Sequence, residues 1–216
     1  AGMTLTDNRD VPTKFAFPAG ATLGPDRYLV LYADEASAPA GYHLGFTLKQ
    51  SGDDVYLFDR NGLLLDSVVF GPQVADYSIG RLVNGQWGLT MPTLGAVNAP
   101  ARTGDTATLK VNEWLAAPGV AGDDFIELFN PDPLPVDLSG LHLTDLPYHW
   151  PDRHEIALLS YVAGGGFAVF IADGQVASGP DHLSFGLSAE QGLIGLLAPD
   201  LTPIDSVMYW AQTNQV

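Results

Sequence analysis

The stretch Val55-Tyr56-Leu57-Phe58-Asp59-Arg60-Asn61-Gly62-Leu63-Leu64-Leu65-Asp66-Ser67-Val68-Val69-Phe70 decides the fold class. Two apolar runs, rich in aromatic and β-branched residues, flank a short polar turn, and this pattern is typical of a β-hairpin. Asn61-Gly62 supplies the positive φ angles that such a turn needs. The segment is therefore predicted to form two antiparallel strands.

The hairpin returns in the second half of the chain, with Pro199-Asp200-Leu201-Thr202-Pro203 as its turn. Residues around it recur 139 positions later without gaps. The first copies are Ala33-Asp34, His43-Leu44, Phe46, Leu48, Leu57 and Asp66-Ser67-Val68, and the second copies are Ala172-Asp173, His182-Leu183, Phe185, Leu187, Leu196 and Asp205-Ser206-Val207. Upstream the offset is 138, and Gly2-Met3-Thr4-Leu5-Thr6-Asp7 matches Gly140-Leu141-His142-Leu143-Thr144-Asp145. Such identities in one register predict that both halves share a fold.

A further pair of short apolar runs lies between these matches. Tyr28-Leu29-Val30-Leu31-Tyr32 and Phe167-Ala168-Val169-Phe170-Ile171 are bounded by Gly or Pro on one side and Asp on the other. They are predicted to be central strands, buried on both faces. Gly164-Gly165-Gly166 is interpreted as a tight turn before the second run, matching Gly24-Pro25-Asp26 before the first.

Length and composition agree with two small all-β units. The 216 residues include 24 Gly and 16 Pro, and no long stretch repeats apolar residues at helical spacing. The polar, turn-rich segment Asn98-Ala99-Pro100-Ala101-Arg102-Thr103-Gly104-Asp105 has no apolar anchor, so the boundary is predicted there. Residues 1–101 are called the first unit below, and residues 106–216 the second unit.

Charge and cysteine content exclude several functions. The formal net charge is −16, with 10 acidic and 7 basic residues in 1–104 but 15 acidic and 2 basic in 105–216. So few cations argue against nucleic-acid binding, which requires neutralised phosphates. The lack of cysteine excludes disulfides, thiolate metal sites and cysteine nucleophiles. No apolar run has the roughly 18 residues of a membrane span, so membrane insertion is not expected.

The second unit resembles the lamin tail domain. Val111-Asn112-Glu113-Trp114, followed by Asp123-Asp124-Phe125-Ile126-Glu127-Leu128-Phe129-Asn130-Pro131, is similar to the opening of that family's pattern. The likeness continues through the strand at Asp205-Ser206-Val207. The resemblance implies an immunoglobulin-like β-sandwich, and in bacteria an accessory module of large exported proteins, hence an extracellular or cell-surface location. Asn112, Glu113, Glu127 and Asn130 are interpreted as structural.

The two units differ in which parts of this pattern they contain. The first unit has no counterpart of the two opening segments, and the second lacks the closing segment Ser78-Ile79-Gly80-Arg81, Trp87 and Pro92-Thr93-Leu94-Gly95-Ala96-Val97-Asn98. A sandwich without two strands exposes unpaired edges and part of its core. We therefore expect upstream sequence or a neighbouring molecule to supply them.

Several histidines and carboxylates are candidate ligands. His142, His149, Asp152 and His154, with Asp145 nearby, are candidates for a divalent metal such as zinc, although their spacing matches no recognised zinc signature. His43 and His182 occupy matching positions and are predicted to bond to a turn or strand end. The remaining acidic candidates, for calcium, are more simply solvated turn residues: Asp53, Asp54, Asp123, Asp124 and Asp132.

No motif for hydrolysis or phosphate binding occurs: Gly-x-Ser-x-Gly, His-Glu-x-x-His and the phosphate loop are all absent. The chain is therefore predicted to be a non-catalytic interaction or structural module of a larger exported or surface protein, with a protein or cell-surface ligand and no cofactor. Two alternatives remain: a structural subunit that self-assembles by strand exchange, and a metal-dependent enzyme built around His142, His149, His154 and Asp152.

Overall fold

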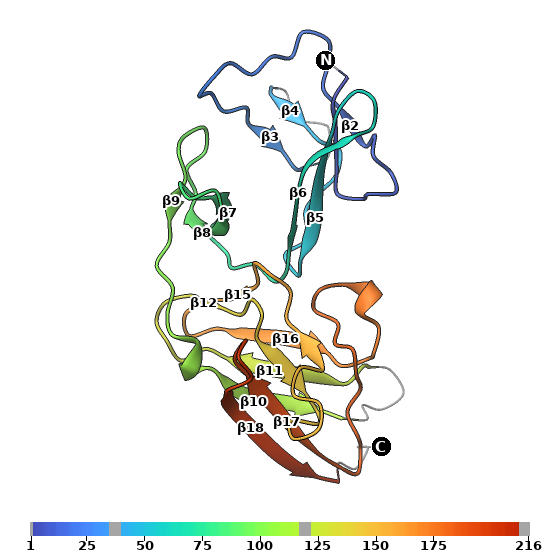
Figure 1. The fold of residues 1–216 in the computed structure, drawn as a ribbon, viewed down its shortest axis with the longest axis vertical. Helices are drawn as coiled ribbons and strands as arrows, with labels where there is room; N and C mark the ends of the chain where they lie inside the picture. Colours follow the sequence, from blue (N-terminus) through green and yellow to red (C-terminus); the bar gives the residue numbers. More distant parts are fainter. Residues whose placement is uncertain (1, 35–39, 117–121, 212–216) are drawn as a thin grey trace.

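The computed structural model describes residues 2–34, 40–116 and 122–211, and it is built almost entirely of short strands and turns (Figure 1). The described residues contain no α-helix, only two single-turn 3₁₀ segments at Thr106–Thr108 and Val176–Ser178. The all-β class predicted from the sequence is therefore confirmed. None of the helical segments in these ranges is long and apolar enough to cross a membrane.

Two sheets of the second unit face each other across one core. One has the order β10-β11-β16, with strands at Lys110–Leu115, Phe125–Phe129 and Phe167–Ile171. The other has the order β14-β13-β17-β18, with strands at His154–Glu155, His142–Thr144, Gln191–Leu197 and Pro203–Trp210. A short pair, β12-β15, lies beside them at Val136–Asp137 and Tyr161–Val162.

Alternation along the strands explains this core. In β11 every second side chain is buried, and Ile126 and Leu128 are 0% exposed. They meet Phe170 from β16 and Leu143 and Leu196 from the opposite sheet, all also at 0%. The second unit is thus a two-layer sandwich whose interior excludes water.

The first unit contains the same kind of four-stranded sheet but a sparser second layer. The four-stranded sheet has the order β2-β1-β5-β6, with strands at Phe15–Ala16, Thr4–Thr6, Asp53–Phe58 and Leu64–Phe70. A parallel pair, β3-β4, is formed by Leu31–Tyr32 and Tyr42–His43. The remaining strands form the sheet β7-β8-β9 at Ser78–Arg81, Trp87–Met91 and Ala99–Pro100.

The four-stranded sheets of the two units share strand order and register. Tyr56 pairs with Ser67 in the first unit, and Gly195 with Ser206 at the same offset in the second. A bulge interrupts both hairpins at one equivalent step, after Leu57 and after Leu196. The turns also close alike, since the amide of Asp59 donates to Leu63 O and that of Ala198 to Thr202 O.

The φ angles of these turns correct one prediction. Only Gly62 of the Asn61-Gly62 pair has a positive φ, at +80°, so the prediction for Asn61 was wrong. In the second hairpin the equivalent position is Leu201, whose φ is +67°. A side chain that rarely adopts the left-handed region is therefore held there by the hairpin.

The two runs predicted to be central strands differ from that prediction. Phe167–Ile171 is a strand, but it lies at the edge of its sheet, and Phe167 and Val169 are 56% and 44% exposed. In the first unit only Leu31–Tyr32 pairs as a strand, while residues 28–30 do not. One face of Phe167–Ile171 is buried, whereas no side chain of residues 28–32 is more than partly buried.

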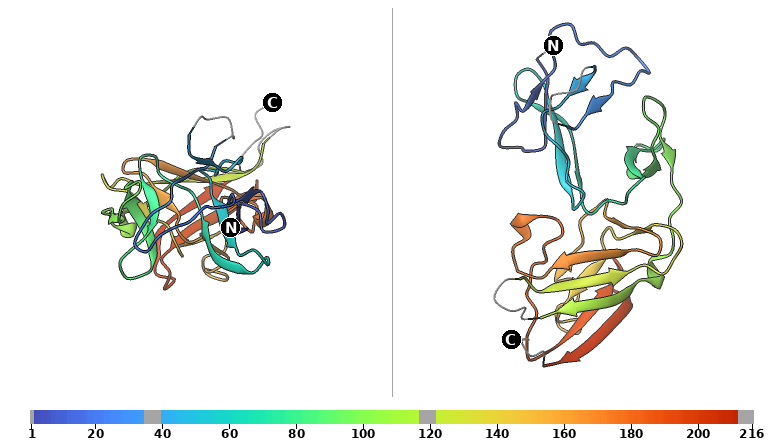
Figure 2. Two further views of the ribbon diagram at one scale, coloured as in Figure 1. Left: turned by 90° about the horizontal axis from the view of Figure 1, so that it is seen from above. Right: turned by 180° about the vertical axis from the view of Figure 1, so that it is seen from behind.

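The units touch through a short backbone contact, visible from behind in Figure 2. Gly71 N donates to Leu158 O at 3.2 Å, and Tyr161 N donates to Pro72 O at 2.8 Å. Gln73 Nε2 adds a bond to Leu159 O at 2.8 Å. The predicted boundary segment is not wholly unstructured, since Ala99–Pro100 forms β9, yet no sheet among the described strands joins the two units.

Candidate functional site

Two of the candidate metal ligands, His142 and His154, lie on the adjacent strands β13 and β14. His142 is only 8% exposed, and no bond is formed by its Nδ1 or by Nε2 of His154 in the part of the chain that is described. Nδ1 of His154 accepts a hydrogen bond from Ser184 N at 3.2 Å. Burial, and secondarily the electrostatic interaction with His142, lower the pKa of His154.

The other members of that set are not gathered around them. His149 lies in the loop between β13 and β14, where its backbone amide donates to Leu146 O. The carboxylate of Asp145 is bound by Arg153, and Asp152 is exposed. No three His, Asp or Glu side chains in the described ranges are grouped so that they could hold a metal ion.

His43 and His182 make matching contacts in the two units. Nδ1 of His43 lies 2.7 Å from Asp34 Oδ1, and Nδ1 of His182 lies 2.8 Å from Asp173 Oδ2. The hydrogen bond with Asp34 raises the pKa of His43. Each aspartate lies two residues after its strand, so both histidines bond to a strand end, as predicted.

A second matched contact was missed from the sequence. Lys14 Nζ lies 2.6 Å from Asp7 and 5.6 Å from the centre of the Phe46 ring. In the second unit, Arg153 bonds to Asp145 and lies 5.1 Å from the ring of Phe185. The offset of 139 between Lys14 and Arg153 was the available signal, but the two residue types differ and the match was not recognised.

The acidic candidates for calcium are satisfied by nearby protein groups. Asp53 accepts a bond from Lys49 N, and Asp54 from the phenol of Tyr56. Asp132 accepts bonds from the amides of Leu134 and Asp105. Asp124 accepts a bond from Leu187 N. These carboxylates hold turns and strand ends, whereas Asp123 lies beside a segment outside the described residues.

Structural contacts are made by three polar residues of the lamin-tail resemblance, Asn112, Glu127 and Asn130. Asn112 Nδ2 donates to Glu127 Oε1 at 2.7 Å across β10 and β11. Asn130 is 0% exposed, and its Nδ2 donates to Leu134 O and Ala163 O, both at 2.9 Å. Its Oδ1 accepts a bond from Asp132 N. Each group fixes strand register or a loop.

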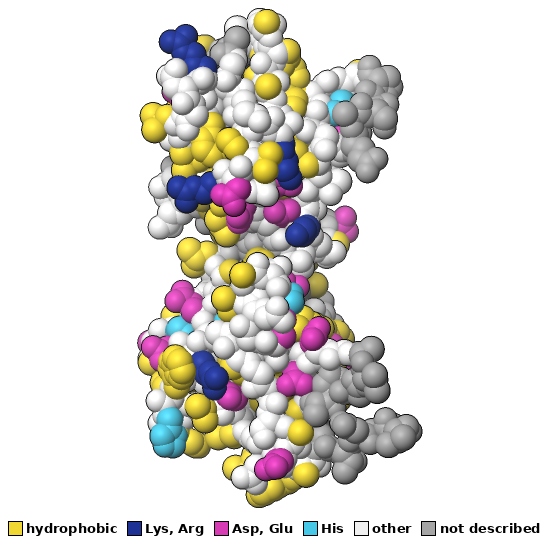
Figure 3. Space-filling model, turned by 90° about the vertical axis from the view of Figure 1, so that its right-hand side faces the viewer, with side chains coloured by type: hydrophobic (Ala, Val, Ile, Leu, Met, Phe, Trp, Pro, Cys, Tyr) yellow, Lys and Arg dark blue, Asp and Glu magenta, His cyan; other side chains and the backbone are white. Residues whose placement is uncertain are grey.

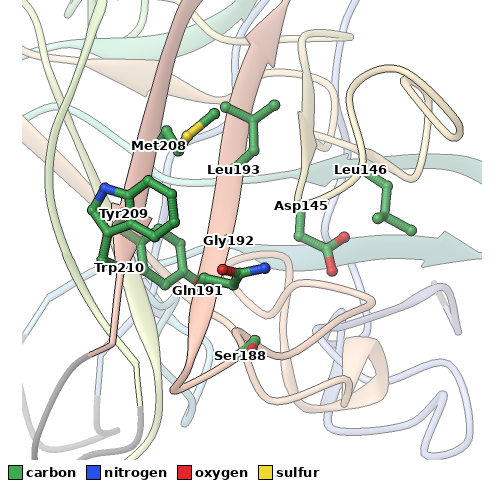
Figure 4. A pocket seen from close by; sticks show the side chains of 9 residues that line it. All are labelled: Asp145, Leu146, Ser188, Gln191, Gly192, Leu193, Met208, Tyr209 and Trp210. Atoms are coloured by element: carbon green, nitrogen blue, oxygen red, sulfur yellow. The ribbon is translucent and has the colours of Figure 1, made fainter.

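A groove of about 510 Å³ crosses the outer face of β17 and β18 (Figure 4). Leu193 and Met208 are cross-strand partners at one end, and Gln191 pairs with Trp210 at the other. Asp145 borders the groove from the loop after β13. The first unit has Asp54, Val69 and Gly71 at the places of Leu193, Met208 and Trp210, so it does not repeat the side chains that line this groove.

A partly unfilled apolar surface lies on the inner face of the first unit's four-stranded sheet. We call this surface the open face. A cavity of about 280 Å³ occupies one end of it. The side chains that define the open face line this cavity, and they are Met3, Leu5, Phe17, Leu29, Leu31 and Leu57. A second cavity of about 440 Å³ continues along the same face, where Val55 and Phe70 meet Ile79 and Trp87 from β7 and β8.

The second unit shows what the open face lacks. Residues at the matching positions are 0–7% exposed, whereas every member of the open face is only partly buried. The matching residues are Leu141, Leu143, Ile156, Ala168, Phe170 and Leu196. Ile126 and Leu128 of β11 fill the space above them. The open face is therefore a sandwich interior without the strand that seals it.

Charge is distributed unevenly over the same molecule. On the side shown in Figure 3, Lys and Arg side chains lie mainly on the first unit, at the top, and His side chains mainly on the second. This follows the sequence, in which residues 1–104 carry 7 of the 9 basic residues. The open face thus belongs to the less acidic half, where an anionic partner is repelled less.

Comparison with protein-family models, with curated proteins and with solved structures gives no match to this chain.

Proposed function

We propose that the chain is a non-catalytic interaction module that binds a polypeptide partner through the open face of the first unit. The single observation that carries this proposal is the difference in burial between Leu5, Leu31 and Leu57 and their fully buried counterparts Leu143, Phe170 and Leu196. Partly exposed apolar surface that a homologous unit buries is the feature expected of a docking surface.

The setting of the module is also a proposal. The resemblance to lamin tail domains favours two immunoglobulin-like units within a larger exported or surface-exposed bacterial polypeptide. The chain has no cysteine, so binding involves no disulfide exchange. The module can act through packing and backbone hydrogen bonds alone. The contact of His43 with Asp34 supports a structural role for this histidine, because it holds the segment after Leu31–Tyr32 next to the open face, and His182 makes the matching contact in the second unit.

Paired substitutions test whether the open face is a surface or a core. Leu143→Asn should lower the free energy of unfolding by about 3 kcal/mol or more, because it buries an amide in a closed core. Leu5→Asn, at the matching position, should cost only about 1 kcal/mol. Chemical denaturation, monitored by tryptophan fluorescence and by amide exchange, measures how much the free energy of unfolding of each unit decreases. If Leu5→Asn is as damaging as Leu143→Asn, the face is a closed core and the proposal fails.

Binding of an apolar dye gives an independent measurement. The native chain should bind 1-anilinonaphthalene-8-sulfonate saturably, and Leu57→Asn should weaken that binding by about tenfold, which corresponds to about 1.4 kcal/mol. Leu201→Asn, in the second hairpin and outside the open face, is the matched control and should leave it unchanged. Absence of dye binding by the folded native chain would overturn the proposal.

A further inference from the structure

The groove on the outer face of β17 and β18 has a wall that is fixed without a ligand. A Cβ added to Gly195 would lie 2.9 Å from Pro147 Cβ, so glycine lets the loop after β13 rest on β17. The buried hydroxyl of Thr144 donates to Trp150 O at 2.7 Å and accepts a bond from Leu146 N at 2.9 Å. Two points of this loop are thus tied to one buried side chain, which holds the wall in place.

The floor of the groove carries no side chain at Gly192. This residue pairs with Tyr209, and a Cβ added to it would lie 2.4 Å from the Tyr209 hydroxyl oxygen. Tyr209 is only 4% exposed and packs in the core of the second unit, so it has no space to move aside. Position 192 therefore stays open, and the side chains that line the groove stand around it.

Three polar side chains border the groove: Asp145, Ser188 and Gln191 (Figure 4). Gln191 is exposed, and its amide forms no hydrogen bond with the part of the chain that the structure describes. The hydroxyl of Ser188 accepts a bond from Glu190 N at 3.3 Å and retains its own proton to donate. The free amide and the hydroxyl can therefore each donate and accept a hydrogen bond.

Apolar side chains complete the lining of the groove. Leu193 lies opposite Met208, and Gln191 lies opposite Trp210, so the free amide stands beside the indole. Met208 is 62% exposed and Trp210 is 70% exposed. Apolar surface of this extent in water, next to unpaired polar groups in a groove, is typical of a ligand site.

Charge restricts the ligand of this groove. Among the described residues that line it, none is basic, so an anionic ligand such as a nucleotide or an acidic glycan finds no counter-charge. The one acid, Asp145, is paired with Arg153. A single paired carboxylate attracts a cationic ligand weakly and supplies far fewer oxygens than calcium requires. The ligand that fits this lining is therefore neutral.

The sheet backbone restricts the ligand further. β17 pairs with β13 along one edge and with β18 along the other, so its backbone groups are used within the sheet. A peptide that lay across the face of these strands would find no free strand edge in the groove. This disfavours a polypeptide and leaves recognition to the side chains.

We infer that the groove binds a neutral saccharide, with one sugar ring packed on Trp210 and its hydroxyls bonded to Gln191 and Ser188. A sugar ring has apolar C–H faces and a rim of hydroxyls that donate and accept, which matches the indole and the two polar groups. The volume of about 510 Å³ lies within the roughly 300–1,000 Å³ typical of small-molecule sites. This site lies on the second unit, apart from the open face, and does not depend on the proposed function.

Three neutral oligosaccharides serve as probes: cellohexaose, xylohexaose and mannohexaose. At least one of them should bind the full chain saturably in isothermal titration calorimetry, with a change in tryptophan fluorescence. Trp210→Ala should weaken that binding by at least about tenfold, and Gln191→Ala by about threefold. Trp210→Phe, which keeps an aromatic face, should retain more of the binding than Trp210→Ala does.

Phe167→Ala is the matched control, because Phe167 is a 56% exposed aromatic residue on the other sheet of the same unit. This variant should leave saccharide binding unchanged. Trp210 and Phe167 are both exposed, so both variants should fold, and circular dichroism verifies this. Hexagalacturonate, a carboxylated counterpart of the probes, should bind at least about tenfold more weakly than the best neutral probe.

Several outcomes would overturn the inference. They are failure of all three neutral probes to bind, binding that survives Trp210→Ala, equal loss in Phe167→Ala, and binding of hexagalacturonate as tight as that of the neutral probes. A dimer in sedimentation that Trp210→Ala dissociates, without saccharide binding, would show that the groove is a contact between copies of the chain instead. None of these outcomes bears on dye binding at the open face, so the proposed function is tested separately.

Discussion

At the scale of single residues, the two units repeat their contacts as well as their sequence. Thr6 and Thr144 are both 0% exposed, and their hydroxyls accept bonds from Asn8 N and Leu146 N at 3.0 and 2.9 Å. In both units this buried hydroxyl and its hydrogen bond fix the backbone where the chain leaves β1 or β13. These threonines have a structural role, because their hydroxyls bond to the backbone, and they are not candidates for ligand binding.

His154 gives a prediction at this scale. Its pKa is lowered by burial, so the unfolded chain binds a proton more readily than the folded chain. The stability that comes from keeping it neutral is present above the unfolded pKa of about 6.5 and is lost as the pH falls below that value. Protonation also removes the acceptor that Nδ1 offers to Ser184 N.

His154→Gln should therefore make the urea midpoint less dependent on pH between about pH 5 and about pH 8 than it is in the native chain. Glutamine retains an acceptor for Ser184 N but does not titrate. His149→Gln, in the adjoining loop, serves as the control for the same substitution at another histidine. An unchanged slope for His154→Gln would contradict this account.

Sequence reasoning predicted that His43 and His182 bond to a turn or strand end, without naming their partners, and it missed the contacts that repeat only chemistry. His43 with Asp34 and His182 with Asp173 could be anticipated, because all four residues recur at one offset. The pairing of Lys14 with Asp7 could not be recognised as readily, because Arg153 takes its place in the second unit. Which side chains approach a buried histidine depends on strand pairing, which spacing alone does not define.

At the scale of elements, the two hairpins have one backbone course and different residues at its most demanding position. Gly62 has φ +80° and Leu201 has φ +67°. Leucine is strained in this region by roughly 1–2 kcal/mol, whereas glycine is not. The two turns therefore store different amounts of strain in the same geometry.

Exchanging these residues tests that difference. Gly62→Leu should lower the stability of the first unit by about 1 kcal/mol. Leu201→Gly should raise that of the second by about 0.5 kcal/mol, because relief of strain outweighs the greater freedom of the unfolded chain. Arg60→Leu introduces leucine at a neighbouring exposed position and controls for hydrophobicity. Thermal unfolding of the native chain and the three variants measures these changes. A loss of stability for Leu201→Gly as large as that for Gly62→Leu would refute the argument.

Strand formation in residues 28–32 shows why element prediction failed in part. Their sequence has the same pattern as Phe167–Ile171, yet only Leu31–Tyr32 is paired. Strand-forming residues pair where a neighbouring strand and a covering layer exist, and among the described residues no strand lies beside 28–32 as β11 lies beside β16. No local pattern in residues 28–32 could reveal the absence of that neighbour.

At the scale of the whole molecule, the relative placement of the units depends on a close approach of two backbones. A Cβ added to Gly71 would lie 1.9 Å from Ser160 Oγ and 3.1 Å from Ser160 Cβ. Tyr161, beside this contact, is 4% exposed, and burial raises its pKa to about 12. The contact is therefore dry and leaves no space for a larger residue at position 71.

Gly71→Ala should consequently separate the units without unfolding either one. Ser160 is itself fully buried, and its hydroxyl is held by Ala157 O at 2.6 Å, so it cannot simply rotate away from the added methyl group. Small-angle scattering should show a larger radius of gyration than that of the native chain. Calorimetry should show two separate unfolding transitions, one for each unit, whereas in the native chain the unfolding of the two units is more strongly coupled. Gly24→Ala is the matched control, since a Cβ there would lie no closer than 3.6 Å to its nearest neighbour, Arg27 Cγ.

A second substitution distinguishes the clash at this contact from general damage. Ser160→Ala removes the Oγ atom that lies closest to the added Cβ and leaves the nearest neighbour at 3.1 Å. The double variant Gly71→Ala, Ser160→Ala should therefore recover much of the native compactness, although each single change is unfavourable by itself. This non-additivity is expected only of residues in direct contact. If the two effects simply add, the units are held together elsewhere, and the contact of Gly71 with Ser160 does not set their arrangement.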